Sequence, residues 1–484
     1  MQKNKFLFLL KKLSRQELED FHKYLKRNHQ GEKIALRAFE YLIRFYPDFE
    51  QKDKISLASV YQKSFKTDFD PDERGQKNMQ NTASQLGGWL KNFLIISKVQ
   101  QDASLQQMIW LGILQERDLK DEFSRKAAAF YQQTRSTPFK SPADALPNWM
   151  ASYFHREHIS WVKPLMQAKI IEQCTETMTS CWEIIRLKMA CEMSMVKRIT
   201  DEAAIQKMKA ATDFQQLGIS ILKDTYAALW RLTDTGEAEH FIHLELLLKQ
   251  HGQHIDPKEL EWVIRYAYNF TAHQSRLNPD PTHYERMHNL NKIGIAHGVF
   301  LRDGYLPSSA FGNFVQVACL AKDFVWAARF IQEYSRIVLE NDRTKAILLA
   351  QAILAYETGK FREVLNLIED VDFHAHLDIL RSKSLLLRSY YELQADQDTI
   401  LDTCAYFENL LRHSPKVEAV KAMLAFTLIL KKLATQRSSK KVILDCINKA
   451  PVLYSKTWLL EKTQQYIAKY AERKLAPERH TLAI

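Results

Sequence analysis

The stretch "AILLAQAILAYETGKFREVLNLIEDV", from Ala346 to Val371, decides the fold. Two apolar segments with helical spacing meet at "ETGKF", in a chain that uses only 13 glycines in 484 residues. Glycine reaches left-handed backbone angles without a side-chain clash, so Gly359 suits a tight turn between two helices. Beyond that turn, Phe361 and Val364 can pack back on the first helix. The stretch therefore predicts a helix–turn–helix hairpin.

Similar hairpins precede and follow this one. The turn at Gly359 corresponds to residues 322–324 upstream and to residues 395–397 downstream, a period of about 36 residues. An apolar helix comes before each turn, and another comes after it. Repetition of one supersecondary unit predicts an array in which neighbouring hairpins share a core. The residues predicted to form that core are Phe324, Ala327, Phe361 and Val364.

These hairpins resemble tetratricopeptide repeats, which share a Gly-x-aromatic-x-x-small turn and a period near 34 residues. The resemblance extends from Ser308 to Ala450, over three clear hairpins and a looser fourth. Val364 and Ile400 stand where the family prefers alanine, and Gln397 replaces the aromatic residue, so the family's carboxylate clamp is not carried over. The layout also resembles uncharacterised bacterial helical proteins that join a short N-terminal bundle to such repeats. Irregular helix pairing is the alternative interpretation.

The composition predicts an all-α protein. Hydrophobic residues make up 46% of the chain, glycine and proline number 13 each, and no proline occurs between Pro307 and Pro415. Proline breaks helix interiors, so long proline-free stretches favour helix. The predicted fold class is all-α, with a tetratricopeptide-like helical-hairpin array and an N-terminal helical bundle. The predicted domains are a basic bundle at 1–134, a middle helical region at 149–275, helical repeats with a terminal capping helix at 284–475 and a frayed tail at 476–484.

The N-terminal region carries most of the positive charge. Residues 1–100 hold 19 Lys+Arg and 12 Asp+Glu, so +7 of the chain's net charge of +11 lies there. "SRQE" at residues 14–17 has the form of a capping box and predicts a helix start. The basic residues predicted to form an exposed surface are Lys11, Lys12, Lys23, Lys26, Arg27 and Lys91. Such a surface suits an acidic partner, nucleic acid included.

Two sharper interpretations of this region stay open beside a plain docking bundle. Its leucine–glutamate–phenylalanine rhythm is similar to that of death-fold interaction bundles. The two helices that end near Trp89 have a rhythm similar to that of winged-helix DNA binders. Two strands packed on the helix that holds Trp89 would favour the second interpretation.

No motif in the chain predicts catalysis, a metal or a cofactor. Phosphate-binding, dinucleotide-binding and nucleophile-elbow motifs are absent, as is any C-x-x-C pair. Three pairs of histidines stand one helical turn apart, but none has the order His-Glu-x-x-His, and we interpret them as solvated or core residues. These pairs are His155 with His158, His240 with His243, and His251 with His254. Cys174 and Cys181 are interpreted as small hydrophobic core residues.

The sequence therefore predicts a non-enzymatic scaffold that binds a protein or peptide in a groove of the repeats. The partner's identity and the oligomeric state stay open. The residues predicted to line the groove are Asn313, Gln316, Tyr356, Arg388 and Glu392. A nucleic-acid-binding regulator is the first alternative, and an enzyme whose residues meet only in space is the second. The longest apolar run is too short for a membrane span, and the N-terminus lacks a signal-peptide pattern, so we expect a cytoplasmic protein without membrane insertion.

Overall fold

All regular secondary structure in the described part of the chain is helical, which confirms the predicted all-α class. Beyond the helices, isolated bridges join Arg302 to Tyr305 and Leu306 to Val338. The computed structural model describes residues 5–46, 49, 55–69, 73–162, 167–196, 220–278, 280–302, 304–415, 417–436 and 438–475. The predicted frayed tail, 476–484, lies outside the described residues.

The chain divides into two compact units. The first comprises Met1–Ser136 and Pro147–Thr175, and the second comprises Thr137–Leu146 and Glu176–Ile484. The division into three domains and a tail, inferred from sequence, stays a prediction. The helices of the first unit are α1 (Lys5–Leu10), α2 (Arg15–Asn28), α3 (Lys33–Leu42), α4 (Leu57–Phe65), α5 (Glu73–Gln101), α6 (Ala103–Glu116), α7 (Lys120–Arg135) and α8 (Ala145–Val162), the last of which begins in the second unit's residues. Helix α9 (Gln167–Val196) begins in residues of the first unit and continues in residues of the second.

Helices α1 to α5 enclose the core of the N-terminal bundle. The capping box is confirmed at the start of α2, where Ser14 Oγ accepts a hydrogen bond from the Glu17 N–H (3.2 Å) and the Glu17 carboxylate accepts one from the Ser14 N–H (2.7 Å). Leu18, Phe21 and Leu25 of α2 are buried, as their shared helix face predicts. A separate core lies between α6, α7 and α8.

The second unit starts with helices packed against the later part of α9. They are α11 (Ile221–Thr235), α12 (Ala238–His251), α13 (Pro257–Leu277) and α14 (Pro281–Ala296). Asp256 and Asp280 accept hydrogen bonds from the first turns of α13 and α14, whose first residues are prolines. Both signals mark helix starts because proline needs no donor there and a carboxylate satisfies a free N–H. Helix α12 ends at His251, next to Gly252.

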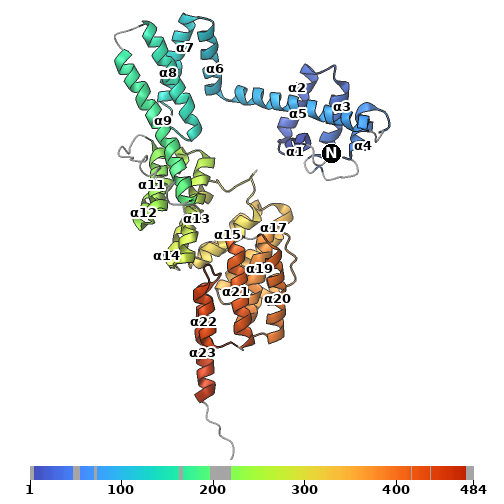
Figure 1. Cartoon of the computed structure of the whole chain (residues 1–484), viewed down its shortest axis with the longest axis vertical. Helices are drawn as coiled ribbons and strands as arrows, with labels where there is room; N and C mark the ends of the chain where they lie inside the picture. The colour runs from blue at the N-terminus through green and yellow to red at the C-terminus, as the bar shows by residue number, and fades with distance from the viewer. Residues whose placement is uncertain are drawn as a thin grey trace, which may run out of the picture. The chain divides into compact units, whose positions relative to one another are not determined.

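Four helical hairpins and a last helix complete the unit (Figure 1). They are α15 (Ser308–Leu320) with α16 (Phe324–Tyr334), α17 (Glu340–Glu357) with α18 (Phe361–Ile368), α19 (His376–Glu392) with α20 (Gln397–His413), α21 (Glu418–Thr435) with α22 (Lys440–Lys449), and α23 (Lys456–Leu475). Short 3-10 helices occur at Ile43–Phe45, Pro142–Asp144, Gly252–His254 and Ser335–Ile337. Each helix from α15 to α23 packs against its neighbours in chain order.

The hairpin turns share one backbone geometry. Gly359 has φ of +79°, as predicted, and Lys322 takes the same left-handed conformation at 63° in the preceding hairpin. In the third hairpin the left-handed residue is Gln394, with φ of 54°. It lies one residue before Ala395, the position that corresponds to Gly359 when the hairpins are compared with each other. In each turn the N–H of a residue just beyond the helix donates to a carbonyl five residues back, over 2.9, 2.8 and 3.0 Å. This is the Schellman arrangement, which ends a helix and reverses the chain.

The predicted hairpin core is confirmed for Ala327 and Val364, which have no exposed surface. It is wrong in degree for Phe324 and Phe361, which are only partly buried and pack against the edge of the core. Each of these phenylalanines is the first residue of a helix, next to the turn, where solvent reaches one side of the ring. The ring of Phe361 lies 5.3 Å from that of Tyr356, measured between centroids.

Candidate functional site

Helix α19 carries a stripe of charged residues on one face. Asp378, Arg381, Arg388 and Glu392 follow at intervals of three, seven and four residues, which is the repeat of a helix face. All four side chains are mostly buried, because α19 contributes to two hydrophobic cores and is covered on most sides. A charged stripe on a covered helix must find partners inside the unit.

At the start of the stripe, Arg381 ties α19 to α15 and α13. Its Nη1 donates to the Ser309 carbonyl (2.9 Å) and its Nη2 to Asn313 Oδ1 (3.2 Å). The Asn313 amide in turn donates to Tyr268 Oη (2.9 Å). Asp378 Oδ1 lies 3.8 Å from Arg381 Nη1. The four side chains form a continuous polar connection across three helices.

Burial shifts the pKa values of Asp378 and Arg381. It raises the pKa of Asp378, although the nearby Arg381 acts in the opposite direction. It also lowers the pKa of Arg381, against the attraction of Asp378. Both shifts point toward the neutral forms, so the cost of desolvation exceeds the attraction between the two charges.

Arg388, in the middle of the stripe, lies between two tyrosine rings. Its guanidinium carbon is 4.2 Å from the ring centroid of Tyr356 and 5.6 Å from that of Tyr454. Its hydrogen bonds, from Nη2 to Tyr454 Oη and from Nε to the Ser384 carbonyl, are both 3.4 Å long. Only 6% of the residue is exposed. Within the described residues, no carboxylate lies at ion-pair distance from this guanidinium; Glu357 acts on it from further away.

At the end of the stripe, Glu392 binds two side chains of α23. Its Oε1 accepts a hydrogen bond from Trp458 Nε1 (2.6 Å) and lies 2.9 Å from Lys462 Nζ. Burial opposes the charge of Lys462, yet its pKa is raised by its bonds to Glu392 and Glu461. Glu392 therefore has a cationic partner within the array. Burial opposes the charge of Arg388, yet its pKa is raised by Tyr454, Tyr356 and Glu357, of which only Glu357 is a carboxylate and lies beyond ion-pair distance.

Tyr284 and Tyr356 border the stripe. Burial raises the pKa of Tyr284 on α14, and the charges of Glu357 and Tyr454 add to this effect. Burial likewise raises the pKa of Tyr356, and Arg388 acts against it. Residues from α14, α17, α19 and the segment before α23 therefore lie close enough to influence each other's ionisation. We call Tyr284, Tyr356, Arg388 and Tyr454 the arginine–tyrosine cluster.

The residues predicted to line a groove lie on α15, α17 and α19. Tyr356 and Arg388 contact each other, Asn313 is bonded to Arg381, and Glu392 is bonded to α23. Gln316 is half-buried on the same helix as Asn313. Their role in binding stays a prediction. Four further residues of the site were not predicted: Arg381, Tyr454, Trp458 and Lys462. The spacing on α19 indicates Arg381, whereas no local pattern indicates the other three.

The six basic residues predicted on the N-terminal surface are all exposed. Lys23 Nζ lies 2.9 Å from Asp20, and Lys26 Nζ lies 3.7 Å from Glu40, so acidic neighbours partly offset these two charges. Lys12 lies over the ring of Phe8 at 5.9 Å. No strand packs on α5, which holds Trp89, within residues 5–46, 49, 55–69 and 73–162.

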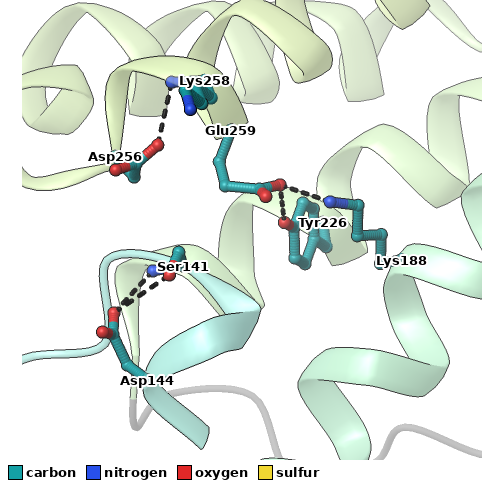
Figure 2. A network of polar contacts seen from close by, with 7 residues as sticks. All are labelled: Ser141, Asp144, Lys188, Tyr226, Asp256, Lys258 and Glu259. Carbon is teal, nitrogen blue, oxygen red and sulfur yellow. Dashed lines mark hydrogen bonds and ion pairs between the residues drawn. The ribbon is translucent and has the colours of Figure 1, made fainter. Parts of the chain in front are cut away.

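Figure 2 shows a second polar network, where α9, α11 and α13 meet. Glu259 accepts hydrogen bonds from Lys188 Nζ and Tyr226 Oη, each 2.6 Å long. Burial raises the pKa of Tyr226, and its bond to Glu259 adds to the shift. Lys188 also lies 4.9 Å from the ring centroid of Trp262. Each charge has a partner inside the network, which makes it a structural joint between the three helices.

Of the histidines and cysteines singled out from the sequence, His240 and Cys181 have polar contacts within the chain. His240 lies 3.3 Å from Glu237 near Glu239, in a mostly exposed group of the kind that occurs without a metal. The side chain of His158 lies outside the described residues. Cys181 is buried, and its thiol donates to the Ala145 carbonyl over 3.2 Å. Burial raises the pKa of Cys174, which favours the unreactive thiol.

Comparison with protein-family models, with curated proteins and with solved structures gave no match. None of the described helices combines the length and the apolar character needed to cross a membrane.

Proposed function

We propose that the protein is a non-enzymatic, tetratricopeptide-like scaffold whose hairpins bind a protein segment that carries a carboxylate. The observation behind this proposal is Arg388, a buried cation that has no carboxylate at ion-pair distance among the described residues. Taking a cation out of water costs several kcal/mol, and two tyrosine rings return about 1–2 kcal/mol each. A residue kept at such a cost is a candidate for recognition.

The contrast with the neighbouring charges supports this assignment. Arg381 has Asp378 and two oxygen acceptors, and Lys462 has Glu392. An incoming carboxylate would give Arg388 the same kind of partner, through the charge-assisted bonds that planar guanidinium groups form best. The surrounding tyrosines would supply apolar contact and hydroxyl donors for the adjoining peptide. The proposed location is cytoplasmic.

A panning experiment tests the proposal. The full chain is immobilised and exposed to a random peptide library, together with Arg388→Met and a control, Arg362→Met, whose arginine is exposed on α18. We expect acidic peptides to be enriched on the wild type and the control, and to lose at least about tenfold in affinity on Arg388→Met. Equal binding to all three proteins, or no enrichment of carboxylates, would contradict the proposal.

The nucleic-acid regulator stays the rival hypothesis. It depends on exposed lysines and arginines, of which two already have acidic neighbours. Binding that survives near-physiological salt would favour it over the scaffold.

A further inference from the structure

The segment between α22 and α23 folds back onto the two preceding hairpins. The backbone N–H of Tyr454 donates to the Ala422 carbonyl of α21 over 3.2 Å. Its hydroxyl lies 3.3 Å from Ser384 Oγ and accepts a hydrogen bond from Arg388 Nη2 over 3.4 Å, both on α19. Its ring packs edge-on against Phe426 of α21, at 5.5 Å between centroids. Tyr454 therefore bridges the first helices of the third and fourth hairpins.

Tyr454 lies against the inner layer of helices in the array. The first helices α15, α17 and α19 pack against one another from hairpin to hairpin, and stacked hairpins use the concave side of such a layer for binding. The charge of Tyr454 also acts on Tyr356 of α17 and on Tyr284 of α14. Tyr356 is 7% exposed and Arg388 6%, whereas Tyr454 is only partly buried. Of the two rings that enclose the guanidinium, that of Tyr454 is therefore nearer to solvent.

The contacts with α19 are firm on α23 and loose at Tyr454. Trp458 Nε1 and Lys462 Nζ of α23 lie 2.6 and 2.9 Å from Glu392 Oε1, which are distances of strong polar contacts. The contacts of the Tyr454 hydroxyl, at 3.3 and 3.4 Å, lie beyond the favoured hydrogen-bond distance. The side chain of Tyr454 can therefore leave Arg388 while α23 stays attached to α19.

Ser455, which joins Tyr454 to α23, has an unfavourable backbone conformation. Its φ is 50°, in the left-handed region that residues other than glycine, asparagine and aspartate rarely adopt. Strain at this residue opposes the position in which Tyr454 covers Arg388. The covered arrangement is therefore held by long hydrogen bonds and weakened by the backbone beside it.

We propose that Tyr454 is an internal occupant of the Arg388 site, and that the partner's carboxylate binds by displacing it. The inference rests on the proposed function, because it concerns the same guanidinium. The Tyr454 hydroxyl holds Nη2, one of the nitrogens through which a guanidinium binds a carboxylate. Only molecules in which Tyr454 has turned away can bind the partner, so the apparent affinity is lowered in proportion to their fraction. The contact between Tyr454 and Arg388 is therefore autoinhibitory.

Fluorescence anisotropy with a labelled hexaglutamate peptide tests the displacement on the full chain. Tyr454→Phe keeps the ring but removes the competing hydroxyl, so we expect the peptide to bind about three- to tenfold more tightly. Ser455→Gly relieves the strain of the covered arrangement, so it should weaken binding about threefold. The matched control is Tyr406→Phe, at an exposed tyrosine of α20, which should leave the affinity unchanged.

The opposite signs of these two effects separate displacement from damage to the fold, because damage would weaken binding in both variants. Binding that needs Arg388 but that Tyr454→Phe leaves unchanged or weakens would overturn this inference and leave the proposed function in place. Equal binding by the wild type and Arg388→Met would contradict the proposed function, and the inference with it. Absence of hexaglutamate binding in every variant would also overturn the inference, whereas the peptide library tests the proposed function independently.

Discussion

Replacing Arg388 by methionine separates a recognition role from a structural one. Methionine is similar in length to the aliphatic part of arginine. The change therefore removes the buried charge and leaves an apolar side chain between Tyr356 and Tyr454. It loses two cation–π contacts, about 1–2 kcal/mol each, and two hydrogen bonds at 3.4 Å that lie beyond the favoured distance. It also relieves the desolvation of the guanidinium, a cost of several kcal/mol that Tyr454, Tyr356 and Glu357 offset in the folded chain. We expect the free energy of unfolding to stay equal or to rise by up to about 2 kcal/mol.

Arg381→Met is the matched comparison. It removes an arginine from the same face of the same helix, but leaves Asp378 buried without its cation and leaves the Ser309 carbonyl and Asn313 without a donor. Removal of one partner of a buried pair costs about 3–5 kcal/mol. The two variants should therefore differ by more than about 3 kcal/mol.

Hydrogen exchange of peptides that cover α19 is the suitable assay, because a chain of two units does not unfold in one step. Arg381→Met should lower the protection of α19 amides about a hundredfold or more, whereas Arg388→Met should not lower it. A comparable loss in both variants would make Arg388 a structural link and would remove the basis for a carboxylate-bearing partner.

Three other predictions concern the hairpin turns and the N-terminal charges. Gly359→Val should destabilise the second hairpin by about 1–3 kcal/mol, because a β-branched residue is strained at φ of +79°, whereas Lys322→Gly should stabilise the first by up to about 1 kcal/mol. Hydrogen exchange of peptides that cover α15 to α18 measures both changes, and an unchanged Gly359→Val would contradict the turn geometry. Duplex DNA should bind only weakly and be released at about 150 mM salt in a gel-shift titration, because Asp20 and Glu40 offset nearby lysines. At that salt concentration, replacing Lys23, Lys26 and Arg27 by alanine should have little effect on DNA binding. Tight binding of DNA by the wild type that this replacement abolishes would favour the nucleic-acid-binding regulator.

The helical periodicity and the turns could be predicted from sequence because both depend on local physics. The left-handed residue at Gly359 and the buried Val364 depend on neighbours within one hairpin. The offset in the third hairpin could not be predicted, since Gln394 has no glycine-like signature and its conformation is imposed by the packing of the flanking helices. The partial burial of Phe361 likewise depends on how the neighbouring helices pack around the turn.

The polar stripe of α19 shows where the periodicity of a helix stops being informative. A period of 3.6 residues places Asp378, Arg388 and Glu392 on one face, and on most helices such a face is exposed to solvent. Here the face is covered, because residues from the segment around Tyr454 and Trp458, far along the chain, close over it. Sequence spacing cannot show that closure, so it finds the charged side chains without showing which of them are neutralised. Only the contacts of each charge separate Arg381 and Glu392, which have oppositely charged partners, from Arg388, which has no carboxylate at ion-pair distance among the described residues. That difference selects Arg388 for the first experiment.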